Sequence, residues 1–378
     1  MEFSVAQLAR DLEGLTPHEH GFTYLDLEHL PLGHGRLDGW VLSAKDLSDV
    51  AGMPTSLGSA ARRYMATVTD PFLAQLEDEG ARIIGKSASP ELGLIIDTEP
   101  TGMDWVDNPL WPGRTPGGSS GGAAVQVARG LLRAAHAGDG GGSIRVPAAA
   151  CGIVGFKPAG EDLGVAGFMT TSIADQAILH DLRPVKPRAR IGILTQPLFA
   201  EVAVDPVMLR AVAQARTALN AAGYECIDID PYPQAHQTFE SFRRIFTAHT
   251  AGLEDAEGYV AWVRDLGRQV STRQLADARN HAAHLPFLLA HTWQVDAILT
   301  PMLAFDPPAR GTFRALPHPE NFDAQTRWSP WGSLFNVARL PAVCLPWEVP
   351  GRQPVGVQLG SITLSEPELL GLALELHA

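Results

Sequence analysis

Residues 139–147, with the sequence DGGGSIRVP, place three consecutive glycines directly before a serine. Glycine loses more backbone entropy on folding than other residues, so this loop must need an uncovered backbone. A nucleophilic serine requires a base that takes its proton and amides that hold the oxyanion formed by attack. Four consecutive backbone amides are candidates for holding the oxyanion, those of Gly140, Gly141, Gly142 and Ser143.

A second pair of serines lies upstream, in the stretch TPGGSSGGAAV over residues 115–125. Four glycines around Ser119 and Ser120 again indicate unusual backbone geometry and close approach of other groups. Further upstream, VLSAKD places Lys45 at the end of an apolar segment that is typical of a buried strand. Burial lowers the pKa of a lysine, so Lys45 is a candidate general base.

Two other chemistries fit the sequence less well. The segment from Gly80 to Ser87 matches the phosphate-loop pattern, but the ARII between its glycines is predicted as a strand, and Pro90 follows where a helix should begin. DGGGSIR has neither a lysine nor the glycine spacing of a dinucleotide site. An arginine two residues after Ser143 excludes the GxSxG elbow of the α/β-hydrolases. We therefore favour acyl transfer.

The glycine- and serine-rich segments resemble the amidase signature family, whose members are amide hydrolases with a Ser–cis-Ser–Lys triad. The resemblance covers most of the chain in the same order, and the central segment is highly specific. The similar stretches are KDLSDVAGMPTSLGS, GKSASPELGL, RTPGGSSGGAAV, GDGGGSIRVPAAACGIVGFKP, VDAILTPML, FNVARLPAVCLP and PVGVQLG.

This resemblance implies a role for each candidate residue. Ser143 would be the nucleophile, Ser119 the bridging serine with a cis peptide bond, and Lys45 the general base. The amides from Gly140 to Ser143 would form the oxyanion hole. The implied reaction acylates Ser143, releases ammonia or an amine, and then hydrolyses the acyl-enzyme.

Several neighbouring polar residues are predicted to support the site. Ser120 either hydrogen-bonds within the site or shapes its loop. Asp139 and Arg145 could bind an acidic substrate, but we favour a buried ion pair that fixes the two ends of the glycine loop. Lys86 and Lys157 each follow a short apolar stretch with no nucleophile at a supporting position, so we expect both to be structural.

The elements that would position these residues alternate between strand and helix patterns. This alternation predicts one large α/β domain over residues 1–378, with a mixed, mostly parallel β-sheet covered by helices on both faces. Strands are predicted at 39–44, 81–84, 190–194, 224–230, 295–303 and 341–349. Helices are predicted at 5–13, 70–80, 123–132, 204–222, most of 235–293, and 366–378.

Within this domain the signature core would span about 39–160, and a variable region at about 230–330 would shape the acyl pocket. Two features depart from the family pattern. Gly140 stands where relatives carry a larger residue such as threonine, and the segment 160–180 is compressed.

Composition restricts the partners and the location. The chain has 378 residues, of which 45% are hydrophobic and 19% are charged, as in soluble globular proteins. Its net charge of −13 disfavours nucleic acid or an anionic membrane as a partner. We find no signal peptide and no apolar stretch of about 18 residues.

The cysteines and the other potential metal ligands also restrict the location and the cofactors. Three widely separated cysteines form neither a disulfide framework nor a zinc site, which indicates a reducing cytoplasm. No cluster of histidine, cysteine, aspartate or glutamate has metal-ligand spacing, so we expect no metal and no cofactor.

These observations favour a stand-alone hydrolase acting on a small-molecule amide, with ester or carbamate cleavage as a variant. One alternative is a glutamine-dependent amidotransferase subunit, which passes ammonia to a partner protein; the short chain favours the hydrolase. A more distant alternative is a catalytically silent binding protein, which the intact set of Lys45, Ser119 and Ser143 disfavours. The chain could also form a homodimer.

Overall fold

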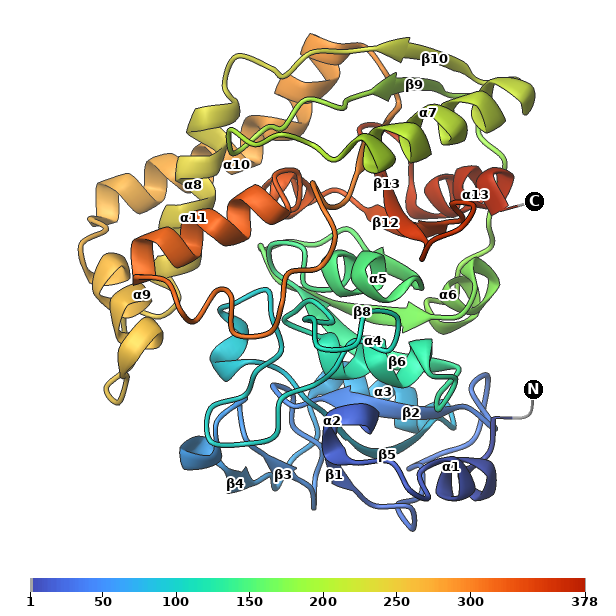
Figure 1. Ribbon diagram of the computed structural model, residues 1–378, viewed down its shortest axis with the longest axis vertical. Helices are drawn as coiled ribbons and strands as arrows, with labels where there is room; N and C mark the ends of the chain where they lie inside the picture. The colour runs from blue at the N-terminus through green and yellow to red at the C-terminus, as the bar shows by residue number, and fades with distance from the viewer. Residues whose placement is uncertain (1–2, 378) are drawn as a thin grey trace.

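Eight strands form the main sheet of the computed structural model, which describes residues 3–377 (Figure 1). From edge to edge they are β10 (Glu225–Asp228), β9 (Arg190–Ile193), β11 (Ala297–Pro301), β13 (Val355–Ser361), β12 (Ala342–Trp347), β7 (Val154–Lys157), β8 (Val165–Thr170) and β6 (Ala134–Asp139). Only β10, β9 and β11 run parallel to one another, and the five remaining neighbouring pairs are antiparallel.

The mixed α/β sheet is confirmed, whereas the prediction that it is mostly parallel is wrong. Parallel neighbours need a long crossover connection, and helices supply one between β9 and β10 and again between β10 and β11. The chain from β7 to β8 and from β12 to β13 is too short for a helical crossover, so these strands pair antiparallel.

A smaller sheet carries the lysine. Its order is β1 (Phe22–Leu25), β5 (Arg82–Ser87) and β2 (Val41–Lys45), with β2 parallel to β5. β2 also packs beside β6 at the edge of the main sheet, where the Lys45 N–H donates to Nδ1 of His136 over 3.2 Å. The end of β2 therefore lies next to the segment that leads into the glycine loop. A short hairpin follows, formed by β3 (Pro54–Thr55) and β4 (Tyr64–Met65).

Helices cover both faces of the main sheet, as predicted. One face packs against α6 (Ile173–Leu179), α7 (Pro206–Ala221) and α13 (Glu366–His377). Successive strand residues point to opposite faces, so Val343 and Leu345 face these helices while Cys344 faces the other side. That other side packs against α4 (Gly121–Ala128) and α5 (Arg145–Cys151).

The remaining helices form two groups, one beside the main sheet and one near the smaller sheet (Figure 1). Those from the middle and late parts of the chain gather beside the main sheet: α8 (Ala235–Ala248), α9 (Gly258–Arg268), α10 (Thr272–Trp293), α11 (His318–Trp328) and α12 (Leu334–Val337). The N-terminal ones lie near the smaller sheet: α1 (Val5–Asp11), α2 (Pro17–His20) and α3 (Pro71–Asp78). No helix within residues 3–377 is long and apolar enough to cross a membrane.

The predicted helices are present where local signals were strong. Asp205 caps α7 by accepting the Val207 N–H, and Pro206 occupies the first turn. A capping box of Ser271 and Gln274 begins α10. The predicted C-terminal helix is also present as α13, except that Ala378 lies outside the described residues.

One glycine of β13 shows how tightly the core is packed. A Cβ atom on Gly360 would lie 1.7 Å from Cζ of the fully buried Phe335 ring. We expect Gly360→Ala to destabilise the fold by about 1–3 kcal/mol, because the ring must leave a packed position. Urea unfolding measures this loss.

Gly252→Ala is the matched control, since a Cβ at this exposed glycine meets nothing within 4 Å. A Gly360 variant as stable as the parent chain, or a Gly252 variant equally destabilised, would contradict the packing argument.

Candidate active site

Lys45 and Ser119 meet in the interior although they come from distant segments. The Lys45 Nζ atom donates to Oγ of Ser119 over 2.7 Å and to the carbonyl oxygen of Gly138 over 3.2 Å. Lys45 is the last residue of β2 and is 4% exposed, while Ser119 immediately precedes the turn into α4. The structure thus brings the predicted base and the predicted bridging serine into direct contact.

Burial alters the protonation of this lysine. It lowers the pKa of Lys45 to about 7, although the negative charge of Asp139 acts in the opposite direction. Near neutral pH a substantial fraction of Lys45 is therefore uncharged and able to accept a proton.

His136 is the neighbour that the sequence did not indicate. Burial, together with the charge of Lys45, lowers the pKa of His136 to about 3, so its ring is neutral. Because Nδ1 accepts the Lys45 N–H, the ring proton must reside on Nε2. A neutral ring adds no positive charge beside Lys45, and it anchors the backbone from which the lysine extends.

The loop that carries Ser119 is held by its own hydrogen bonds. The peptide bond between Gly118 and Ser119 is cis, as the resemblance implies. Thr98 donates to the carbonyl of Gly117 over 2.7 Å and accepts the Gly121 N–H over 3.1 Å. These contacts hold the chain on both sides of Ser119.

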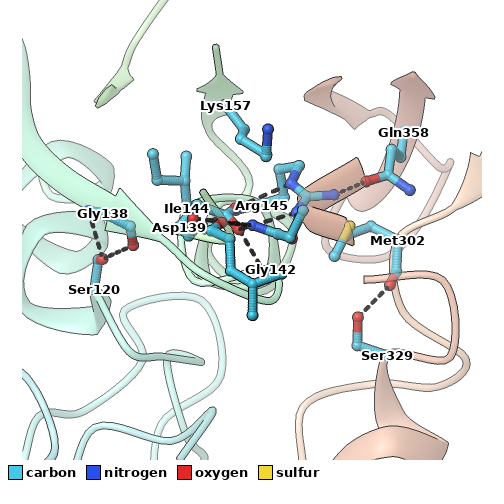
Figure 2. Close-up of polar contacts among 12 residues, drawn as sticks. Ser120, Gly138, Asp139, Gly142, Ile144, Arg145, Lys157, Met302, Ser329 and Gln358 are labelled. Atoms are coloured by element: carbon cyan, nitrogen blue, oxygen red, sulfur yellow. Dashed lines mark hydrogen bonds and ion pairs between the residues drawn. The ribbon is translucent and has the colours of Figure 1, made fainter. Parts of the chain in front are cut away.

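Ser120 faces the end of β6. Its hydroxyl donates to the carbonyl of Gly138 over 3.2 Å, as Figure 2 shows, and Gly138 is also an acceptor for Lys45. Of the two roles predicted for Ser120, this contact supports a hydrogen bond within the site.

The glycine loop contains both free and occupied amides. The N–H of Gly142 donates to Oδ1 of Asp139 over 2.7 Å, and that of Ile144 donates to Oδ2 over 3.0 Å. The prediction that the amide of Gly142 belongs to the oxyanion hole is therefore corrected, because Asp139 already occupies it. Within residues 3–377 the amides of Gly140, Gly141 and Ser143 donate to no protein acceptor.

The structure disfavours a side chain at two of the three glycines. Gly142 has a φ of +124°, which side chains disfavour, and a Cβ on Gly141 would lie 2.9 Å from Cζ of Phe242. Gly140 is different, because a Cβ there would meet no atom closer than 4.0 Å, the Cα of Gly164. The structure therefore leaves room for a Cβ atom at this position.

A buried ion pair between Asp139 and Arg145 fixes the glycine loop (Figure 2). The Arg145 guanidinium donates to both Asp139 oxygens, over 2.9 and 3.0 Å, and both side chains are fully buried. Burial alone would raise the pKa of Asp139, but the charge of Arg145 and its hydrogen bonds hold that pKa well below its ordinary value. This is the ion pair that the sequence favoured over a substrate-binding role.

Two residues from the C-terminal part of the chain complete this pair. Asn336 donates to Oδ1 of Asp139 and to the Leu163 carbonyl, each over 2.9 Å, while Gln358 accepts from Arg145 over 2.7 Å. Neither was predicted as a site residue, although Asn336 lies in FNVARLPAVCLP and Gln358 lies in PVGVQLG, two of the stretches that resemble the family.

The two other lysines considered from the sequence lie in structural positions. Lys86 donates to Thr55 Oγ1 over 2.8 Å and lies 3.5 Å from Asp46. Lys157 donates to two backbone carbonyls, those of Pro158 and Leu340.

A cavity of about 690 Å³ opens in front of Ser143, a size usual for small-molecule sites. Ser143 is 8% exposed and lines this cavity together with Lys45, Ser119, Gly140 and Gly141. Gly142, Ser120 and Arg145 do not line it. Within the part of the chain that the structure describes, no group of three or more histidine, cysteine, aspartate or glutamate side chains could hold a metal ion.

The ion pair leads to a stability prediction. Arg145→Met leaves the Asp139 carboxylate buried without its counter-charge, so we expect a loss of about 3–5 kcal/mol. Unfolding in urea at neutral pH measures this loss. The control is Arg273→Met, because Arg273 is 93% exposed and lies 4.0 Å from Asp277 at the surface. Similar stability of both variants would show that the pair does not support the fold.

Comparison with known proteins agrees with this geometry. The Amidase family model matches residues 27–183, which contain the lysine, both serine-rich loops and the ion pair. AmiB2 of Mycobacterium tuberculosis, a protein assigned as an amidase, is 30% identical to this chain. That alignment covers 90% of this chain and 81% of the relative.

Solved structures share the fold over nearly the whole chain. The structure of 6-aminohexanoate cyclic dimer hydrolase complexed with substrate has a TM-score of 0.87 at 23% identity, covering 99% of this chain and 92% of that chain. A bacterial aryl acylamidase of the amidase signature enzymes has a TM-score of 0.76 at 19% identity, covering 99% and 94%. The sequence similarity and the shared fold together show that the chain belongs to the amidase signature family of amide hydrolases.

Proposed function

We propose that this amidase hydrolyses a small carboxylic amide to an acid plus ammonia or an amine, through an acyl-enzyme on Ser143. The contact that carries the proposal is the 2.7 Å hydrogen bond from Lys45 Nζ to Ser119 Oγ, made by a lysine whose pKa is lowered to about 7. Ser143 and the free glycine amides line the same cavity as this pair.

In the first half-reaction, Ser143 Oγ attacks the amide carbonyl carbon. Its proton passes to Ser119, whose own proton passes to neutral Lys45. The carbonyl oxygen becomes an oxyanion, and the amides of Gly140, Gly141 and Ser143 are the donors available to hold it. When the carbon–nitrogen bond breaks, the same relay returns the proton to the leaving nitrogen.

In the second half-reaction, water attacks the acyl carbon of the ester on Ser143. Lys45 takes the water proton through Ser119, and the carbon–oxygen bond to Ser143 breaks as this serine regains a proton. The products are the free acid and the starting enzyme. Esters and carbamates could follow the same steps, since only the leaving group differs.

The two other functions considered differ in what the purified chain would do alone. A glutamine-dependent amidotransferase subunit would show little activity without its partner, and a silent binding protein would show none. The Lys45–Ser119 contact disfavours the silent protein, because an inactive fold has no need for a buried lysine bonded to a serine. Amine release from a panel of aryl, aliphatic and dipeptide amides separates the hydrolase from the other two.

Three expectations accompany this proposal. We propose one amidase domain over 1–378, with its signature core at about 39–160 and its variable region at about 230–330. Phe239 and Phe322 of the variable region line the cavity, which supports that division. We also propose a cytoplasmic location, which the three free cysteines support. A homodimer stays a prediction, which light scattering can test.

The lowered pKa of Lys45 predicts a pH profile. A general base must be unprotonated, so kcat/KM should rise with pH through about 7 and then reach a plateau. Lys45→Met should lower kcat by about 10²–10⁴-fold and remove this rise. Lys45→Arg should be equally impaired, because arginine stays protonated. Initial rates between pH 5 and 10 test this.

The control for these variants is Lys186→Met, since Lys186 is 58% exposed and pairs with Glu375 at the surface. The Lys186→Met variant should keep the pH profile of the parent enzyme. An active Lys45→Arg enzyme with an unchanged profile would assign the base to another group.

The nucleophile can be identified without knowing the substrate. A fluorophosphonate probe should form an adduct on the peptide that contains Ser143, and mass spectrometry should locate it there. Ser143→Ala should carry no adduct, and Ser119→Ala should react much more slowly because the relay to Lys45 is broken. An adduct on a different serine, or full amidase activity in Ser143→Ala, would refute the assignment.

A further inference from the structure

Aromatic side chains form one wall of the cavity in front of Ser143. Phe239, Phe242 and Phe246 follow one another at spacings of three and four residues, so they share one face of α8. Their ring centroids are 6.0 Å apart for the first pair and 5.4 Å apart for the second, in stacked orientations. Phe322 of α11 extends this wall, with its ring 6.2 Å from that of Phe239. We refer to these four residues as the phenylalanine wall.

The phenylalanine wall reaches the proposed oxyanion loop. A Cβ on Gly141 would lie 2.9 Å from Cζ of Phe242, so the ring edge contacts the loop beside Ser143. The acyl carbon would be bonded to Ser143 and its oxygen held by the glycine amides. A group attached to that carbon would therefore begin next to Phe242. Further apolar residues line the same cavity, namely Leu92, Leu94, Ile95, Ile96, Leu163 and Leu253.

The charges around the cavity do not suit a substrate carboxylate. Among the described residues that line it, Lys45 is the only lysine or arginine, and its Nζ is already bonded to Ser119. Asp139 is paired with Arg145, whose guanidinium lies outside the lining. Asp162 lines the cavity with an exposed carboxylate and would repel another anion.

Two polar side chains of the lining, those of Ser329 and Gln325, are hydrogen-bonded to other parts of the protein. Ser329 donates to the carbonyl of Met302 over 3.2 Å, as Figure 2 shows. Gln325 accepts the Ile96 N–H over 3.0 Å and donates to the Tyr259 hydroxyl over 3.1 Å. A polar acyl group would lose its water without gaining equivalent partners from these two residues.

We propose that the substrate is an amide whose acyl group is uncharged and either aromatic or a long alkyl chain, bound against the phenylalanine wall. This inference rests on the proposed function and narrows it to a substrate class. It also separates this chain from an enzyme that uses glutamine, whose α-carboxylate would find no free lysine or arginine among the described residues that line the cavity.

The test compares three primary amides, in which only the acyl group varies: acetamide, 3-phenylpropanamide and L-glutamine. Ammonia release by the purified full-length chain gives kcat/KM for each. We expect 3-phenylpropanamide to exceed acetamide by about 10–100-fold, the range expected from burying one phenyl-bearing side chain. Glutamine should react no faster than acetamide.

Variants of the partly exposed wall residues localise the effect. Phe239→Ala and Phe246→Ala should each lower the ratio of kcat/KM for 3-phenylpropanamide to kcat/KM for acetamide by about 10-fold. The matched control is Phe287→Ala, because Phe287 is 76% exposed on α10 and does not line the cavity. It should change neither value.

A preference for glutamine or acetamide would overturn the inference and leave the proposed function standing. Wall variants that lower the rates of both acetamide and 3-phenylpropanamide equally would also overturn it. A different result would contradict the proposed function: no amide releases ammonia, and Ser143 carries no fluorophosphonate adduct. That outcome would overturn both.

Discussion

The buried ion pair between Asp139 and Arg145 is the interaction on which the site depends. Desolvating two charges is costly, and the cost is recovered only when the pair and its remaining hydrogen-bonding groups are fully satisfied. Here Asn336 and Gln358 satisfy them, and Asp139 also accepts the amide of Gly142. The pair therefore ties the glycine loop to α12 and β13, so residues from the last part of the chain hold a loop near its middle.

Position, rather than the lowered pKa alone, distinguishes Lys45, the proposed base, from the other buried lysines. Burial lowers the pKa of Lys157 to about 7, as it does for Lys45, yet Lys157 donates to two carbonyls and does not line the cavity. Lys86 is also buried, but Asp46 and Thr55 occupy its ammonium group. Of these three lysines, all within the described residues 3–377, only Lys45 has both an uncharged form near neutral pH and a serine within hydrogen-bond distance in the cavity.

The fold could be predicted where short-range signals suffice. Proline and aspartate mark the starts of α3 and α7, and apolar runs predict β2, β5 and β9. β6 was missed because its sequence, AAHAGD, consists mainly of small residues with no strand periodicity, and it is a strand because β8 pairs with it. Strand direction was predicted wrongly because it depends on which strands become neighbours, and that depends on contacts across the whole chain.

For the site, residue types and spacing determined the candidates: a glycine run that ends at Ser143, the serine pair that begins at Ser119, and a lysine at the end of a buried strand. Only the tertiary structure brought Lys45 to Ser119 across 74 residues, assigned the Gly142 amide to Asp139, and set the rings of α8 against Gly141. A local motif indicates which backbone segment must carry no side chains and which side chains are able to react. Burial, the pKa shifts that follow from it, and the shape of the cavity arise where distant segments pack together, and no local pattern encodes those contacts.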